Sequence, residues 1–274
     1  MRSRAEPPVS ELDVLGRIAA RTKERVARWK AERPETALAD EPLYARKPRS
    51  LARALSVPGP RFIAEVKFAS PSEGFLRKPG SASPREAARI AASYADAGAA
   101  AVSILTEFEH FSGAPAFLTA ARRARPDALL LMKDFLIDPY QLDLARACGA
   151  DAVLLIASLL GPRLHEMLFA ARARGLSALV EVHDEVEAEA ALAATADVVG
   201  VNNRDLRTLK TDPEVARRLA SLARRASAAV AESGLKTRAD VDALAALGYK
   251  GFLVGTALMK EKDPGGALAA LIAA

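Results

Sequence analysis

The sequence is poor in cysteine, aromatic residues and long apolar runs. Cys148 is the only cysteine among 274 residues, so the chain can form no internal disulfide. It follows a helical stretch, where a small buried residue is a better interpretation than a nucleophile. No apolar run approaches the roughly 18 residues of a membrane span, and the start lacks the apolar segment of a secretion signal. We therefore expect a cytoplasmic protein.

The sequence also lacks the features of a nucleic-acid surface or a metal site. Aromatic residues make up 5% of the chain, and 39 basic residues against 34 acidic ones leave a net charge of +5. The basic residues are dispersed through Ala-rich stretches, which argues against nucleic acid, although the small excess suits an anionic ligand. His110, His165 and His183 are scattered and share no metal-ligand spacing with the cysteine, so we expect no metal.

From residue 61 onward a short apolar run, a turn and an Ala-rich helical stretch repeat eight times. The apolar runs span residues 62–66, 101–105, 129–132, 152–156, 178–182, 198–201, 228–231 and 252–254. Continuous apolar runs between turns indicate parallel strands that are buried on both faces. Eight βα units of about 30 residues predict a closed (βα)8 TIM barrel in the α/β class. An open doubly wound sheet is less favoured, because no Gly-x-Gly-x-x-Gly turn follows the first run.

We interpret residues 1–50 as an N-terminal helical extension, packed on a barrel of residues 51–274. Ser10, with Asp13 three residues later, predicts the start of a helix. A membrane-surface helix is the rival interpretation, but it would need a stronger apolar face. The apolar positions at helical spacing are Leu12, Leu15, Ile18, Val26 and Trp29.

Polar residues follow the predicted strands at the points where their carboxyl ends would meet at one rim. They are Glu65 and Lys67, Thr106 and Glu107, Lys133 and Asp134, Ser158, Glu181 and His183, residues 202–205, Glu232 to Gly234, and Gly255 with Thr256. A single charge at a strand end is more often a solvated cap or an ion pair than a catalyst. Several charges at one rim can shift one another's pKa, which acid–base chemistry requires. We interpret His183 as structural.

The last two strand ends predict a phosphate site. Ser233-Gly234 and Gly255-Thr256 offer backbone N–H groups, and barrels often bind phosphate with the loops after strands seven and eight. The alternative is that both are simple turns. From the residues alone we predict a small phosphorylated ligand and general acid–base chemistry.

The motifs in combination resemble those of the indole-3-glycerol-phosphate synthase family. They lie in residues 62–72, 103–107, 133–141, 149–156, 179–184, 200–206, 231–234 and 252–259. The resemblance extends over about residues 10–265, and each motif alone would be weak. It implies a carboxy-lyase of tryptophan biosynthesis that needs no cofactor. Such an enzyme converts 1-(2-carboxyphenylamino)-1-deoxyribulose 5-phosphate to indole-3-glycerol phosphate, CO2 and water.

The resemblance also implies roles for individual residues. Lys133 would be the general acid that protonates the ribulose carbonyl, and Glu181 the acid–base group of the later dehydration. Glu65 and Asn202 would orient hydroxyls, and Lys67 would hold an anionic group and share the acid role. Arg204 would neutralise substrate charge. The implied phosphate site is Ser70, Ser233, Gly234, Gly255 and Thr256, and the apolar pocket for the anthranilate ring is Pro71, Phe135, Leu154, Leu206 and Leu209.

We expect neighbouring cations and partial desolvation to lower the pKa of Lys133 toward neutrality. Glu73 departs from the family pattern, since many relatives have a basic residue there, and Thr256 stands where many have Ser or Glu. No apolar stripe is left over for a partner chain, so we expect a monomer that binds only its small phosphorylated substrate.

Two rivals share the phosphate motifs. Phosphoribosylanthranilate isomerase would use a Cys–Asp pair, but Cys148 precedes the fourth run and so lies at the wrong end of the barrel. A non-catalytic sensor of phosphorylated ligands would not need both Lys133 and Glu181. The joint presence of these two residues favours an enzyme.

Overall fold

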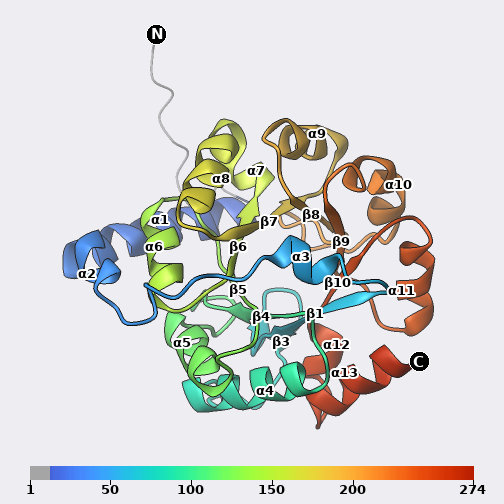
Figure 1. Cartoon of the computed structure of the whole chain (residues 1–274), viewed down its shortest axis with the longest axis horizontal. Helices are drawn as coiled ribbons and strands as arrows, with labels where there is room; N and C mark the ends of the chain where they lie inside the picture. Colours follow the sequence, from blue (N-terminus) through green and yellow to red (C-terminus); the bar gives the residue numbers. More distant parts are fainter. Residues whose placement is uncertain (1–12) are drawn as a thin grey trace.

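A closed barrel of eight parallel strands forms the centre of the computed structural model, which describes residues 13–274 (Figure 1). The strands are β1 (Arg61–Val66), β4 (Ala101–Leu105), β5 (Leu130–Lys133), β6 (Ala152–Ile156), β7 (Ser177–Val182), β8 (Val198–Asn202), β9 (Ala228–Glu232) and β10 (Gly251–Val254). Strand β1 pairs with both β4 and β10 and so closes the barrel. Each predicted run matches one strand to within one residue at either end. The TIM-barrel prediction is confirmed.

Helices form a ring around the strands (Figure 1). They are α4 (Pro84–Asp96), α5 (Pro115–Ala124), α6 (Tyr140–Ala147), α7 (Ala157–Leu160), η2 (Gly161–Arg163), α8 (Leu164–Ala173), α9 (Glu185–Ala193), α10 (Glu214–Ala223), α11 (Arg238–Ala245), α12 (Thr256–Met259) and α13 (Pro264–Ala273). The N-cap of α4 is Ser83, whose hydroxyl accepts a hydrogen bond from the Glu86 N–H at 3.2 Å. None of the described helices is both long enough and apolar enough to cross a membrane.

The apolar core has two layers because side chains alternate along each strand. In β1, Ala64 and Val66 belong to the layer between strands and helices. Ile63 belongs to a second layer, which fills the inside of the barrel. Glu65 shares the period of Ile63 and therefore points inward as well.

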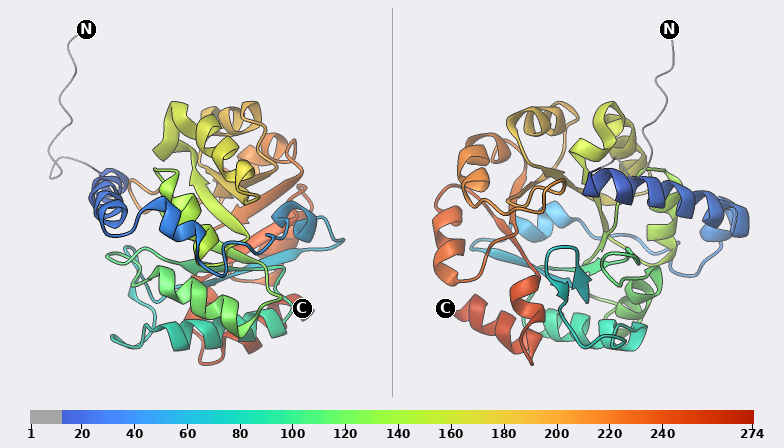
Figure 2. Two further views of the ribbon diagram at one scale, coloured as in Figure 1. Left: turned by 60° about the vertical axis from the view of Figure 1, so that its left-hand side comes forward. Right: turned by 180° about the vertical axis from the view of Figure 1, so that it is seen from behind.

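The segment before β1 covers both ends of the barrel. Helix α3 (Leu51–Leu55) lies across the amino end of the strands, where the Leu51 N–H donates to the Ser177 hydroxyl at 3.0 Å. Helix α1 (Val14–Glu32), followed by the short α2 (Glu35–Ala39), lies beside the opposite end (Figure 2, right). Its apolar side, which includes Leu15, Ile18 and Val26, is buried.

The N-cap of helix α1 lies three residues after the predicted one. Its N-cap is Asp13, whose carboxylate accepts a hydrogen bond from the Gly16 N–H at 2.8 Å. Asp13 is therefore the capping residue itself and not the third residue of a helix that begins at Ser10. Ser10 and Leu12 lie outside the described residues.

The loop after β1 contains a small antiparallel sheet that the sequence analysis did not predict. Its strands are β2 (Ala69–Ser70) and β3 (Gly74–Phe75). Gly74 turns the chain with a φ of 67°, a left-handed conformation that glycine adopts without strain. The Ala69 N–H donates to the Phe111 carbonyl at 3.2 Å, which ties this hairpin to the loop after β4. The hairpin forms one wall of the barrel mouth (Figure 2, right).

Candidate active site

Four strands place a charged side chain at the inner, carboxyl end of the barrel. In each case the charged residue comes two positions after an apolar residue of the inner layer, so both point to the same side of the strand. The pairs are Ile63 and Glu65 on β1, Leu131 and Lys133 on β5, Leu179 and Glu181 on β7, and Val230 and Glu232 on β9. The barrel geometry therefore brings one amine and three carboxylates together from distant parts of the sequence.

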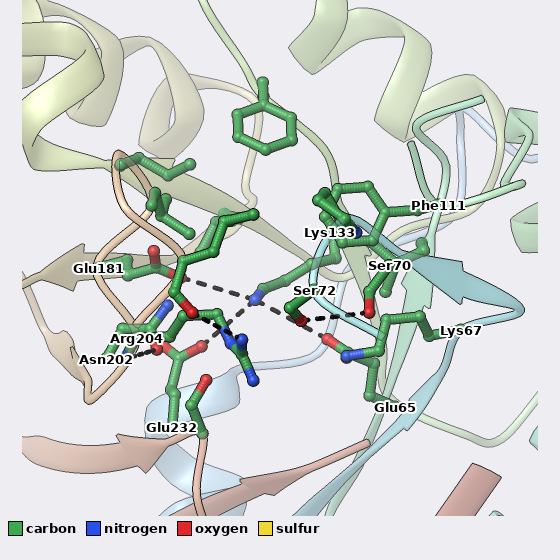
Figure 3. Close-up of a pocket in the computed structure, with 18 of the residues that line it drawn as sticks. Glu65, Lys67, Ser70, Ser72, Phe111, Lys133, Glu181, Asn202, Arg204 and Glu232 are labelled. Atoms are coloured by element: carbon green, nitrogen blue, oxygen red, sulfur yellow. Dashed lines mark hydrogen bonds and ion pairs between the residues drawn. The ribbon is translucent and has the colours of Figure 1, made fainter. Parts of the chain in front are cut away.

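The Lys133 amine lies among these three carboxylates (Figure 3). Its Nζ is 3.3 Å from Glu232 Oε2, 3.5 Å from Glu181 Oε2 and 3.8 Å from Glu65 Oε2. We call these four residues the Lys133 cluster. All three carboxylates are buried, with at most 3% of each residue exposed. Charges this deeply buried are costly unless they pair with one another, and here the amine provides the shared partner.

The expectation of a lowered pKa for Lys133 is wrong. Burial alone would lower the pKa of the amine, but Glu232, Glu181 and Glu65 together raise it well above its ordinary value. The residues nearest to Lys133 are anions and not the expected cations. Burial raises the pKa of Glu232 to about 7, against the opposing pull of Lys133 and with further help from Glu181.

Glu65 and Lys67 form a second contact at the edge of the cluster. Lys67 Nζ lies 2.8 Å from Glu65 Oε1. Burial would raise the pKa of Glu65, but Lys67 and Lys133 lower it below its ordinary value, so this carboxylate stays ionised. The two lysines therefore share one carboxylate, and only Lys133 reaches the other two.

Two glycines provide the space for the buried carboxylates. A Cβ on Gly200 would lie 2.2 Å from Glu232 Oε1, and a Cβ on Gly255 would lie 2.5 Å from Glu65 Oε1. Both distances are shorter than any tolerable contact, so larger residues there would displace the acids. Gly255 thus has a steric role in addition to its predicted place in the phosphate site.

The predicted site residues line two neighbouring pockets. The first is lined by fourteen of the sixteen: Glu65, Lys67, Ser70, Pro71, Lys133, Phe135, Leu154, Glu181, Asn202, Arg204, Leu206, Leu209, Ser233 and Thr256. The remaining two, Gly234 and Gly255, line the second, which shares Glu65, Lys67, Arg204, Ser233 and Thr256 with the first. A mostly apolar hollow with a few convergent charges is typical of a small-molecule site.

The second pocket is lined by backbone in an uncommon conformation and by the Arg204 guanidinium. Ser233 and Gly234 are both left-handed, with φ of 65° and 79°, and so is Leu209 of the first pocket, with a φ of 63°. Non-glycine residues in this conformation are strained and tend to occur at functional sites. The Arg204 guanidinium also lines this pocket and donates to the Leu209 carbonyl at 3.0 Å. The Asn202 side-chain oxygen accepts from the Arg204 N–H at 2.9 Å, which holds the start of this loop.

Some residues at the site were not among those predicted. Glu232 was noted as a strand-end residue but given no role, although it follows an apolar run just as Glu65 and Glu181 do. Phe111 also lines the pocket, from the loop after β4, and Val14 and Ile18 reach it from α1. No motif marks these three, because they come from loops and from the N-terminal helix.

His183 and Cys148 lie in different surroundings. His183 Nε2 is 3.4 Å from Glu181 Oε1, so the histidine interpreted as structural contacts the Lys133 cluster. Cys148 follows α6 as its C-cap, and burial raises the pKa of its thiol. A buried thiol with a raised pKa is a poor nucleophile. Within residues 13–274, no group of three or more His, Cys, Asp or Glu side chains is arranged to hold a metal ion.

Comparison with known proteins gives consistent matches over nearly the whole chain. A family model for indole-3-glycerol phosphate synthase matches residues 15–271. A protein of that name from Carboxydothermus hydrogenoformans is 43% identical over 257 residues, which span 92% of this chain and 94% of the relative. Another from Salinibacter ruber is 44% identical over 262 residues, which span 95% of each chain.

Solved structures match the barrel. A mutant tryptophan synthase alpha-subunit from Pyrococcus furiosus aligns with a TM-score of 0.59, over 77% of this chain and 96% of that one. The sequences are 16% identical. A likeness at this identity shows the fold alone.

Proposed function

Because this chain belongs to the indole-3-glycerol phosphate synthase family, we propose that its barrel pocket closes the indole ring with Lys133 as the proton donor. The enzyme is a carboxy-lyase of tryptophan biosynthesis. It converts 1-(2-carboxyphenylamino)-1-deoxyribulose 5-phosphate to indole-3-glycerol phosphate, CO2 and water. The observation that carries the assignment of roles is the position of the Lys133 amine among three buried carboxylates at the base of the pocket.

The two pockets divide the substrate between them. The phosphate binds to the backbone of Ser233, Gly234 and Gly255, with Ser70 and Thr256 contributing hydroxyls. The anthranilate ring occupies the apolar part of the first pocket, which is lined by Pro71, Phe135, Leu154, Leu206 and Leu209. Lys67 and Arg204 line both pockets and balance the negative charges of the substrate.

Ring closure begins when the aromatic carbon attacks the ribulose carbonyl. Lys133 donates a proton to the carbonyl oxygen as negative charge develops on it. The raised pKa of Lys133 keeps its amine protonated, as a donor must be. Glu232, whose pKa is raised by burial, lies 3.3 Å from the amine and is near enough to return a proton to it. The apolar surroundings favour release of uncharged CO2 from the carboxylate.

Dehydration then removes a hydroxyl as water. Glu181 acts as the acid–base group of this step, while Glu65 and Asn202 orient the hydroxyls. Glu232 holds the Lys133 amine in the intervals between proton transfers, since it makes the shortest contact with that amine. Residues 51–274 form the catalytic barrel, and the extension of residues 1–50 contributes Val14 and Ile18 to the pocket wall. We place the enzyme in the cytoplasm as a monomer.

The direct test is an assay of the purified protein with its substrate and a chelator present. Indole fluorescence should appear at pH values between about 6 and 9 without added metal or cofactor. Lys262 is exposed, so the variant Lys262→Met is a suitable control and should have the activity of the wild type. Absence of indole fluorescence throughout this pH range would contradict the proposed function.

A further inference from the structure

A chain of three titratable side chains extends from the Lys133 cluster toward the protein surface. Glu181 Oε1 lies 3.4 Å from His183 Nε2, and His183 Nδ1 lies 3.1 Å from Glu187 Oε2. Among the described residues, neither Glu181 Oε1 nor His183 Nε2 has a hydrogen-bond partner, and the two atoms face each other. A small movement of either side chain would form the bond that both lack.

The imidazole is held in place from its outer side. The Glu187 carboxylate accepts the His183 backbone N–H at 2.8 Å and also contacts Nδ1. Glu187 lies in the first turn of α9, whose N-cap is Asp184. The side chain of His183 is 16% exposed and that of Glu187 is 18% exposed, whereas that of Glu181 is 1% exposed. The chain therefore connects a buried acid to a group that solvent reaches.

The proposed reaction requires such a connection. The substrate loses its carboxylate as CO2 and one hydroxyl as water, so each turnover of the carboxylate form takes up one proton from solution. The acid that protonates the departing hydroxyl must recover its proton before the next turnover. Glu181 is too deeply buried to do so by direct exchange with bulk water.

We infer that His183 supplies this proton to Glu181. The inference rests on the proposed function, in which Glu181 protonates the leaving hydroxyl. The imidazolium gives its Nε2 proton to the Glu181 carboxylate, so that one N–H bond breaks and one O–H bond forms. The neutral ring keeps its Nδ1 proton. Nε2 is buried against Glu181, so the ring must rotate about its Cβ–Cγ bond to bring Nε2 to the solvent side, where it takes a proton from water before the ring returns. His183 is thus a positioning residue that acts through Glu181.

The charges around His183 favour its protonated form. Three carboxylates act on the ring: Glu181 on β7, just before the histidine, Glu187 on α9, and Glu232 on β9. The cation of the Lys133 cluster, Lys133 on β5, contacts Glu181 and Glu232 and not the His183 ring. Burial lowers the pKa of His183, but the contacts with Glu187 and Glu181 outweigh it and raise the pKa above the ordinary value.

The first test is independent of turnover. An NMR titration of the whole protein follows the three histidines, and His183→Asn identifies the signal of His183. We expect this signal to titrate above the range of a free histidine, and its pKa to fall in both Glu181→Gln and Glu187→Gln. His165 is exposed and serves as an internal reference. A His183 titration that neither variant changes would overturn the relay, whether or not the protein makes indole-3-glycerol phosphate.

The second test is kinetic. We expect His183→Asn to lower kcat by about 10-fold to 100-fold with little change in KM, and added imidazole to restore part of the loss. In the wild type, kcat should decrease as pH rises through the pKa of His183, and this limb should be absent in the variant. His165→Asn is the matched control and should keep the wild-type profile.

Two further variants separate proton supply from a structural role. Glu187 does not line the pocket. Glu187→Gln should lower kcat by a smaller factor than His183→Asn, because it weakens only the contact with His183 Nδ1. Combining His183→Asn with Glu181→Gln should cost no more than Glu181→Gln alone. If the decrease in kcat of the double variant equals the product of the two single decreases, the inference is overturned. A His183→Asn enzyme with an unchanged pH profile would also overturn it. An inactive wild type would instead refute the proposed function and leave the NMR result to decide the relay.

Discussion

Two buried charge clusters lie at opposite ends of the same barrel, and they differ in how their carboxylate oxygens are satisfied. At the amino end, Asp151 precedes β6 and is completely buried. Its carboxylate accepts hydrogen bonds from the Arg46 and Arg122 guanidinium groups and from the N–H groups of Arg49 and Leu130. Arg122 further donates to four backbone carbonyls close by, those of Gly149, Arg125, Pro126 and Ala128. We call this group the Asp151 cluster.

At the carboxyl end, the Lys133 cluster leaves hydrogen-bonding capacity unused. Within the described chain, Glu181 Oε1 and Glu232 Oε1 have no hydrogen-bond partner. A buried carboxylate oxygen without a donor is costly, and a protein tolerates it only where another requirement outweighs the loss of stability. The difference teaches that burial of charge alone does not mark a catalytic site. Glu181 and Glu232 line a pocket and each keep one oxygen without a donor, whereas both oxygens of the Asp151 carboxylate accept hydrogen bonds.

The largest expected effect that distinguishes the two clusters is a loss of activity when Lys133 is replaced. Lys133→Met should lower kcat/KM by at least about 100-fold, because the proton donor is lost. The far-UV circular dichroism spectrum should stay that of the wild type, since no backbone hydrogen bond depends on the amine. Steady-state kinetics of the variant, with Lys262→Met as control, measures the effect. Turnover close to that of the wild type would remove Lys133 from its proposed role.

The second effect is a loss of thermal stability when the Asp151 cluster, at the amino end of the barrel, is changed. Asp151→Ala should lower Tm by about 10 °C, because Arg122 would stay buried without its counter-charge. The kcat of the folded variant should be unchanged at temperatures below its transition. Thermal denaturation measures this, with Asp197→Ala as the control for an exposed ion pair. Equal Tm values for the two variants would contradict a structural role for the Asp151 cluster.

The third effect depends on pH and comes from Glu232. Its pKa is about 7 in the folded protein against an ordinary 4.5, so between these values the folded state binds more protons than the unfolded state. Wild-type stability should therefore fall as pH rises through this window. Glu232→Gln lacks this titrating group. The Tm of the variant minus that of the wild type should therefore rise by on the order of 5 °C between about pH 5 and 8.

Glu189→Gln makes the same change of charge at an exposed ion pair with Arg225. Its Tm should follow that of the wild type across the whole pH range. If the Tm curves of Glu232→Gln and the wild type stay parallel, the unpaired oxygen of Glu232 costs the protein nothing, and the contrast between the two clusters loses its energetic basis.

The smallest effect concerns the rim of the second pocket. Glu73 lines it and pairs with Lys260 across 2.7 Å, so the acidic departure from the family pattern neutralises a nearby cation. Glu73→Ala should lower KM about twofold to threefold, since exposed pairs are worth less than about 1 kcal/mol. The gain should shrink at high salt because screening weakens it. A higher KM in the variant would show that Glu73 assists binding.

The barrel could be predicted closely from the sequence because its strands are buried on both faces. Each strand is then one continuous apolar run, and the runs at residues 101–105 and 152–156 coincide with β4 and β6. The β2–β3 hairpin could not be predicted, because two-residue strands in a polar loop carry no periodic pattern. The contributions of Val14 and Ile18 to the pocket depend on how α1 docks, which local sequence does not specify.

The electrostatics of the site were the least predictable feature. Strand-end positions indicated that Lys133 and Glu181 would share a rim, but not which charges would lie nearest to the amine. Glu232 reaches Lys133 because Gly200 leaves room on the neighbouring strand, and that is a fact of packing. The sign of the pKa shift of Lys133 followed from this arrangement and was therefore missed.

The most direct test of the central claim is a crystal structure with a substrate analogue whose ribulose carbonyl is reduced to a hydroxyl. We predict that Lys133 Nζ lies within hydrogen-bond distance of this hydroxyl, with the phosphate held by Ser233, Gly234 and Gly255. An amine that stays among the three carboxylates, more than about 4 Å from the hydroxyl of a fully bound analogue, would contradict it.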